Sequence, residues 1–111
     1  MLDIQKSQIG EITILDISGR VDAINCAYLQ DEIDRAIDGE HERDLLLKMT
    51  GVNYISAAGL RVLRDLKQKT GVVRIVEPGM RVIEVMEITG LDVVYEIFIN
   101  MSDALNEINS K

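Results

Sequence analysis

Apolar residues follow two different periods along this chain, and each period predicts one type of element. Residues 2–8 and 11–18 are rich in β-branched side chains on either side of Gly10, which predicts two strands joined as a hairpin. From about residue 25 to residue 38 the apolar positions recur every three or four residues, which predicts an amphipathic helix. The apolar face of this helix comprises Cys26, Leu29, Ile33 and Ile37, and Gly39 follows as its stop.

The second half of the chain alternates apolar runs with helical periods. The run at residues 44–49 predicts a strand buried on both faces, which leads through a short loop into another amphipathic helix. Ser56 is the expected N-cap of that helix, and its hydroxyl would accept a hydrogen bond from an amide of the first turn. The helix is expected to run to about Thr70 with Leu60, Leu63 and Leu66 inward, and Gly71 is its expected stop. The later expected elements are a strand at 72–76, a helix at 80–89 ending at Gly90, a strand at 93–99 and a terminal helix capped by Asn100 or Ser102.

Strands that alternate with helices of this length predict βαβ units and a largely parallel sheet. We therefore expect an α/β fold with a mixed, mostly parallel β-sheet, an N-terminal hairpin and about four helices. The chain has 111 residues, of which 47% are hydrophobic and only 4% aromatic. This length supports a single domain over residues 1–111, and its core must be built from aliphatic side chains.

The formal net charge of −7 changes the range of expected partners. An acidic chain lacks the clustered positive charge that binding to nucleic acid or to an anionic membrane requires. Charge is also unevenly distributed along the chain. The charged residues in 22–44 are mostly acidic, whereas residues 57–70 carry the basic residues Arg61, Arg64, Lys67 and Lys69. That basic segment is either ordinary solvated surface or a pattern that steers a charged protein partner. With no apolar run of membrane-spanning length and no signal-peptide pattern, we expect a cytoplasmic protein that binds neither nucleic acid nor membrane.

No set of residues with catalytic spacing occurs in the sequence. His41, the only histidine, lies in a polar segment without metal-binding partners, and Cys26, the only cysteine, falls on an apolar helix face. Neither of the glycine-rich patterns that hold phosphates, the P-loop and the dinucleotide fingerprint, is present. We therefore expect no catalytic residues, no metal and no cofactor, and we expect that the protein is not an enzyme.

Several short segments share their residues and spacing with one known family. Residues 49–63 pass from a strand end through Ser56, Ala57 and Ala58 to a Gly-Leu pair at the start of a helix. This segment closely resembles the signature of STAS domains (sulfate transporter and anti-sigma factor antagonist), and among them the bacterial anti-sigma factor antagonists. The same order and spacing are found for Gly-Arg-Val-Asp-Ala at 19–23, Ile-Thr-Gly-Leu-Asp at 88–92, Tyr-Glu-Ile-Phe at 95–98 and Asp-Ala-Leu at 103–105.

In the family that the chain resembles, a serine at this helix start is the phosphorylation switch. Ala57 stands at that position, so the resemblance implies that the usual acceptor is lost. Ser56 is the neighbouring hydroxyl, and it either serves only as the helix cap or accepts phosphate in place of the missing serine. A second departure is Lys48, which stands where many members carry Asp and reverses a local charge.

The resemblance implies a function through protein binding. The expected partner is an anti-sigma factor or serine kinase of the histidine-kinase-like ATPase type, whose capture by this chain would release a sigma factor. We expect the chain itself to be a monomer or a weak dimer. The alternative is a non-enzymatic scaffold subunit of a larger signalling complex. The residues expected to bind the partner are Asp22, Asn53, Ser56, Ala57, Ala58, Gly59, Arg61 and Arg64.

Overall fold

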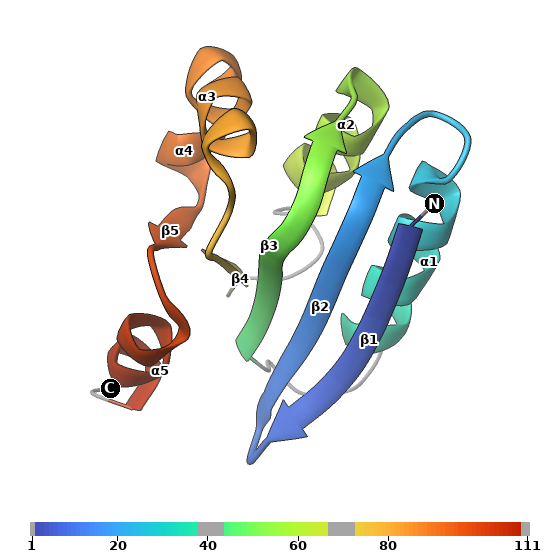
Figure 1. The fold of residues 1–111 in the computed structure, drawn as a ribbon. Helices are drawn as coiled ribbons and strands as arrows, with labels where there is room; N and C mark the ends of the chain where they lie inside the picture. The colour runs from blue at the N-terminus through green and yellow to red at the C-terminus, as the bar shows by residue number, and fades with distance from the viewer. Residues whose placement is uncertain (1, 38–43, 67–72, 110–111) are drawn as a thin grey trace.

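The computed structural model describes residues 2–37, 44–66 and 73–109, which form a five-stranded sheet with helices against both of its faces (Figure 1). The strands lie in the order β1-β2-β3-β4-β5, with β1 antiparallel to β2 and all later neighbours parallel. This mixed sheet with an N-terminal hairpin is the predicted fold class. The strands are β1 (Leu2–Ile9), β2 (Ile12–Val21), β3 (Asp44–Ile55), β4 (Val73–Val76) and β5 (Glu96–Phe98). The helices are α1 (Cys26–Ile37), α2 (Ala57–Leu66), α3 (Met80–Thr89), α4 (Leu91–Val94) and α5 (Met101–Asn109).

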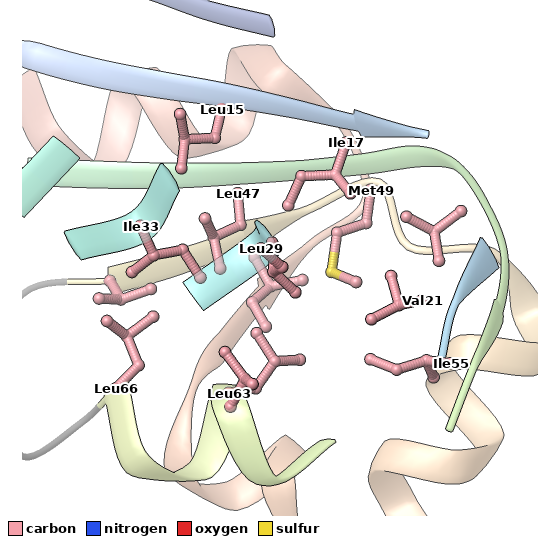
Figure 2. Close-up of a cluster of buried hydrophobic side chains, with 14 of the residues drawn as sticks. Leu15, Ile17, Val21, Leu29, Ile33, Leu47, Met49, Ile55, Leu63 and Leu66 are labelled. Carbon is pink, nitrogen blue, oxygen red and sulfur yellow. The ribbon is translucent and has the colours of Figure 1, made fainter. Parts of the chain in front are cut away.

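The larger core lies between the sheet and helices α1 and α2, which cover the same face (Figure 1). Figure 2 shows Leu63 and Leu66 of α2 directed toward Leu29 of α1 and toward the strands. These three leucines are almost completely buried. Burial of each such aliphatic side chain stabilises the fold by roughly 1.5–3 kcal/mol, so packing is a large part of what fixes this helix pair against the sheet.

A smaller core lies on the opposite face, under α5. Its buried members are Ile12, Ile14, Leu46, Val76 and Ala104. The predicted apolar side of the terminal helix is confirmed, because Met101, Leu105 and Ile108 pack against this cluster.

Glu77 fastens the start of α5 to the sheet. Its carboxylate accepts hydrogen bonds from the Thr50 hydroxyl at 2.7 Å and from the Met101 amide at 3.1 Å. The hydrogen bond from Thr50 is the largest influence on this carboxyl group and lowers the pKa of Glu77 from its ordinary value. Desolvation raises the pKa in part, and the Met101 amide and the Lys48 charge lower it further. The ionised form of Glu77 is therefore the form that holds α5 in place.

The predicted loop after residue 49 is wrong, because β3 continues as a strand to Ile55. The extension has a pairing partner in the equally extended end of β2, where Val21 lies opposite Ile55. The register between the two strands is irregular near Gly51, and a Cβ on that glycine would lie 2.6 Å from the Cβ of Ser18. Glycine thus permits a close approach that keeps the two long strands paired up to the end of the sheet.

The predicted strand at 93–99 is also wrong in its first half. Val93 and Val94 belong to the single-turn helix α4, and β5 retains only three residues. The β-branched side chains of Val93 and Val94 favour a strand. In the structure, however, Leu91 at the start of α4 is buried in the larger core, and Val93 is 85% exposed. With α4 included, the described residues form five helices, where about four were expected.

Other expected features are confirmed. Gly90 ends α3 in the left-handed conformation with φ of 80°, and Asn100 caps α5 by accepting a hydrogen bond from the Asp103 amide at 2.8 Å. Cys26 is partly buried and packs against the larger core. The expected roles of Gly39, His41, Lys67, Lys69, Thr70 and Gly71 lie outside the described residues.

Candidate functional site

A tight turn follows β2 and is held by two side chains that bond each other's backbone. The Asp22 carboxylate accepts hydrogen bonds from the amides of Ile24 at 3.0 Å and Asn25 at 3.1 Å. The Asn25 side-chain oxygen accepts in return from the Asp22 amide at 2.9 Å, and its NH₂ group donates to the Arg20 carbonyl at 2.8 Å. Because every bond joins a side chain to nearby backbone, the turn keeps one shape at the start of α1.

Ser56 connects that turn to the start of α2. Its amide donates to the Val21 carbonyl at 2.8 Å, immediately before Asp22 in the chain. Its hydroxyl accepts from the Gly59 amide at 3.3 Å, which confirms the predicted helix cap. The end of β2 and the start of α2 are therefore held side by side, although 35 positions separate Val21 from Ser56.

Gly59 makes a second close contact at the same place. It is buried, and a Cβ built on it would lie 2.6 Å from Cγ1 of Val21 and 2.9 Å from Cγ1 of Ile55. Real side chains do not approach so closely, so only glycine permits this position of the helix. Gly59 can therefore shape the surface but cannot itself reach a partner.

The other predicted binding residues differ in their access to solvent. Ala57, Asn53 and Arg61 are exposed, whereas Asp22, Ser56 and Ala58 are partly buried. They share the end of the sheet where β2 and β3 finish. Arg64 is exposed but lies further along α2, where its Nε donates to Asp65 at 3.3 Å. The structure thus brings the predicted site together except for Arg64, which lies a turn beyond it, and Gly59, which lies beneath it.

A groove beside this site was not predicted from the sequence. It lies between the end of β3 and α3 and has a volume of about 280 Å³. On the neighbouring strand the guanidinium of Arg20 lies over the ring of Tyr54 at 4.3 Å from its centroid. The residues lining the groove are Asn53, Tyr54, Ile55, Arg81, Val82, Glu84 and Val85.

The polar groups at this end of the sheet are largely engaged in hydrogen bonds to backbone. Within residues 2–37, 44–66 and 73–109, no three His, Cys, Asp or Glu side chains gather in a way that could hold a metal ion. Asp22 already accepts two backbone hydrogen bonds, and the Ser56 hydroxyl accepts one. In the same ranges, each helix is too short or too polar to cross a membrane.

The sequence assigns the chain to a family. A family model of the STAS domain matches residues 3–104, which is nearly the whole chain, and the chain belongs to the STAS domain family. No curated protein sequence matches it.

Several solved structures share the fold. An anti-sigma factor antagonist from Mycobacterium paratuberculosis superposes with a TM-score of 0.89 at 18% identity, covering 98% of this chain and 95% of that one. An anti-sigma-factor antagonist (STAS) domain protein from Planctomyces limnophilus gives a TM-score of 0.80 at 17% identity, with 96% and 97% covered. The anti-sigma factor antagonist SpoIIAA in its unphosphorylated form gives 0.77 at 15% identity, with 98% of both chains covered. At these identities the likeness establishes the SpoIIAA-like fold alone, and membership of this family supports a regulatory role in general terms.

Proposed function

We propose that this protein is an anti-sigma factor antagonist that binds an anti-sigma factor of the histidine-kinase-like serine kinase type and so frees a sigma factor. The observation that carries the proposal is the exposed start of α2 at Ala57, fixed by Ser56 beside the Asp22 turn. Small side chains there let a partner approach the backbone closely. Proteins with this fold include several described as anti-sigma factor antagonists, which supports the same function.

We also propose that the protein stays permanently in its binding form. SpoIIAA from Bacillus has been solved in a phosphorylated form, and that structure shares this fold with a TM-score of 0.67 at 16% identity, covering 96% of this chain and 99% of that one. Ala57 stands where the family resemblance puts the phosphorylated serine, and it has no hydroxyl. The neighbouring Ser56 hydroxyl accepts from the Gly59 amide, and this favours a role as helix cap over a role as phosphate acceptor.

Binding to purified histidine-kinase-like anti-sigma factors from the source genome tests the first proposal. Ala57→Asp should weaken binding, because it places a charge in the middle of the contact that the partner must desolvate. The fold should be preserved, because a helix N-terminus tolerates an acidic side chain. Ser102→Asp is the matched control, since Ser102 is an exposed residue in the first turn of α5. Equal affinity of parent and Ala57→Asp at equal stability would mean that the partner docks elsewhere.

Incubation with the cognate kinase and ATP tests the second proposal. Intact-mass analysis should find no added phosphate on the parent and one phosphate on Ala57→Ser. A phosphate mapped to Ser56 in the parent would contradict the proposal and would make Ser56 the switch.

A scaffold subunit of a larger complex is the second candidate function, and exposed apolar side chains away from the site favour it. Ile88 at the end of α3 is 84% exposed and Val93 in α4 is 85% exposed. Exposed apolar side chains that gather into a contiguous patch are typical of surfaces that contact another protein, and these two come from helices that contact each other. A native complex of several chains that contains no sigma-factor regulator would favour this candidate.

A further inference from the structure

Ile24 is the most exposed large apolar side chain in the part of the chain that the structure describes. It is 92% exposed, although it follows the fully buried Val21 by only three residues. An isoleucine in this position gains nothing for the fold, since it buries almost no surface.

The exposure of Ile24 is built into the local structure. Its own amide donates to the Asp22 carboxylate, and the side chain of Asn25 next to it bonds the Asp22 amide and the Arg20 carbonyl. The side chain is thus held outward by a turn of fixed shape. A residue fixed in advance loses little conformational freedom on binding, which is a property of residues that dominate the energy of an interface.

A second apolar side chain extends the same surface. Tyr28 lies in the first turn of α1, four residues after Ile24, and is 41% exposed. Ala27 lies between them in the sequence and is small and exposed. We call Ile24, Ala27 and Tyr28 the Ile24 patch. Because the Val21 carbonyl accepts from the Ser56 amide, this patch begins next to the start of α2.

Charges on the two flanking helices differ in sign. On α1, Asp31 is exposed three residues after Tyr28, and the exposed Arg35 further along the helix is paired with Glu32 at 3.4 Å. On α2, the exposed Arg61 follows Ala57 by one turn. A protein that covers the Ile24 patch therefore meets negative charge along α1 and positive charge along α2.

We propose that the Ile24 patch is the apolar anchor of the partner interface, and that the partner supplies an apolar recess with a basic group facing α1 and an acidic group facing α2. This inference rests on the proposed function and names the chemistry of its partner. Ile24 fills the recess, and the phenol of Tyr28 covers its rim. The Asp22 turn contributes by holding Ile24 in the bound position before the partner arrives.

The test is isothermal titration of purified histidine-kinase-like anti-sigma factors from the source genome with the parent and two single variants. Ile24→Ala should raise Kd by about tenfold or more, as expected for the central side chain of an interface. The matched control is Ile99→Ala, which removes an isoleucine that is 85% exposed just after β5. That control should change Kd by less than about twofold, and both variants should unfold at the parent's temperature because exposed substitutions hardly affect stability.

A double-mutant cycle distinguishes the contribution of the Ile24 side chain to binding from the contribution of the Asp22 turn that holds it. Asn25→Ala removes the side chain that bonds Asp22 and Arg20, so it should weaken binding in the parent. The same change should have little effect when Ile24 is already alanine, because there is then no anchor to present. Additive effects of the two changes would overturn the role assigned to the turn.

The outcomes distinguish this inference from the proposed function. If Ala57→Asp weakens binding and Ile24→Ala does not, the function stands and the anchor is refuted. If the parent binds none of the anti-sigma factors, both fall. A parent that sediments as a dimer and becomes a monomer on Ile24→Ala would also refute the inference, since the patch would then bind a second copy of the chain.

Discussion

Gly59→Ala is the substitution whose cost follows most directly from the geometry. The new methyl group would lie 2.6 Å from Cγ1 of Val21 and 2.9 Å from Cγ1 of Ile55. Neither neighbour can turn away easily, since Val21 is branched and completely buried and Ile55 is only 6% exposed. The first turn of α2 must therefore move outward by roughly 1 Å or slightly more to reach ordinary contact distance, which is about 3.5–4 Å between carbon atoms.

The expected loss of stability is the difference between two effects. Overpacking of a dense core by one extra methyl group typically costs about 1–3 kcal/mol. Alanine favours the helical conformation over glycine by about 1 kcal/mol, which offsets part of that cost. We therefore expect a net decrease of about 1 kcal/mol, within a range of about 0–2 kcal/mol, in the free energy of unfolding. For a domain of this size a decrease of about 1 kcal/mol lowers Tm by roughly 4–8 °C.

Urea denaturation of the parent, Gly59→Ala and a control variant measures this loss. The control is Gly79→Ala, because Gly79 has an ordinary φ of −69° and a Cβ there would meet nothing closer than the Val52 carbonyl at 3.9 Å. This control should leave the free energy of unfolding unchanged or raise it by up to about 1 kcal/mol. If Gly59→Ala unfolds at or above the urea midpoint of the parent, the start of α2 can move freely and the close contact does not constrain it.

Three further predictions concern other parts of the molecule. The pKa of Glu77 is lowered in the folded state, so the ionised carboxylate stabilises the fold at pH values above the ordinary pKa of glutamate. This stabilisation is lost as the pH falls through the lowered pKa of the folded state. The difference in Tm between the parent and Glu77→Gln should therefore be greatest near neutral pH and disappear in acid. Tyr95→Phe removes a buried hydroxyl that donates to the carbonyl of Leu63, and denaturation should register a loss of about 1 kcal/mol, whereas unchanged stability would mean that the bond adds nothing. Reversal of both Arg61 and Arg64 to Glu should slow association with an acidic partner in stopped-flow mixing, less so at high salt; a rate insensitive to both changes would identify these arginines as ordinary solvated surface.

Much of the fold could be predicted from the chain because local patterns and tertiary packing agree there. The helical period around Leu29 and the apolar run before Met49 both match the buried positions of the structure. The errors arose where pairing between distant segments decides the outcome. Residues 50–55 are polar enough to read as a loop, and they become a strand only because the end of β2 lies beside them.

The site could be predicted in part. The helix cap at Ser56 could be predicted because it depends only on residues close to it in the sequence. The exposure of Arg61 followed from the helical period. Ile24 was missed, because an isolated isoleucine in a turn carries no periodic signal. The Asp-x-x-Asn spacing at 22–25 was the available clue, since two short polar side chains three residues apart often bond each other's backbone.

The hydrogen bond from the Ser56 amide to the Val21 carbonyl means that the proposed docking surface exists only when the chain is folded. A partner that requires both the β2 end and the α2 start has nothing to bind on the unfolded chain, so its binding energy adds to the stability of the fold. A partner present at one hundred times its Kd would contribute about 2.7 kcal/mol in this way. Under the proposed function, the protein would then be best protected from proteolysis while it is bound, and its amount in the cell would follow the amount of its partner.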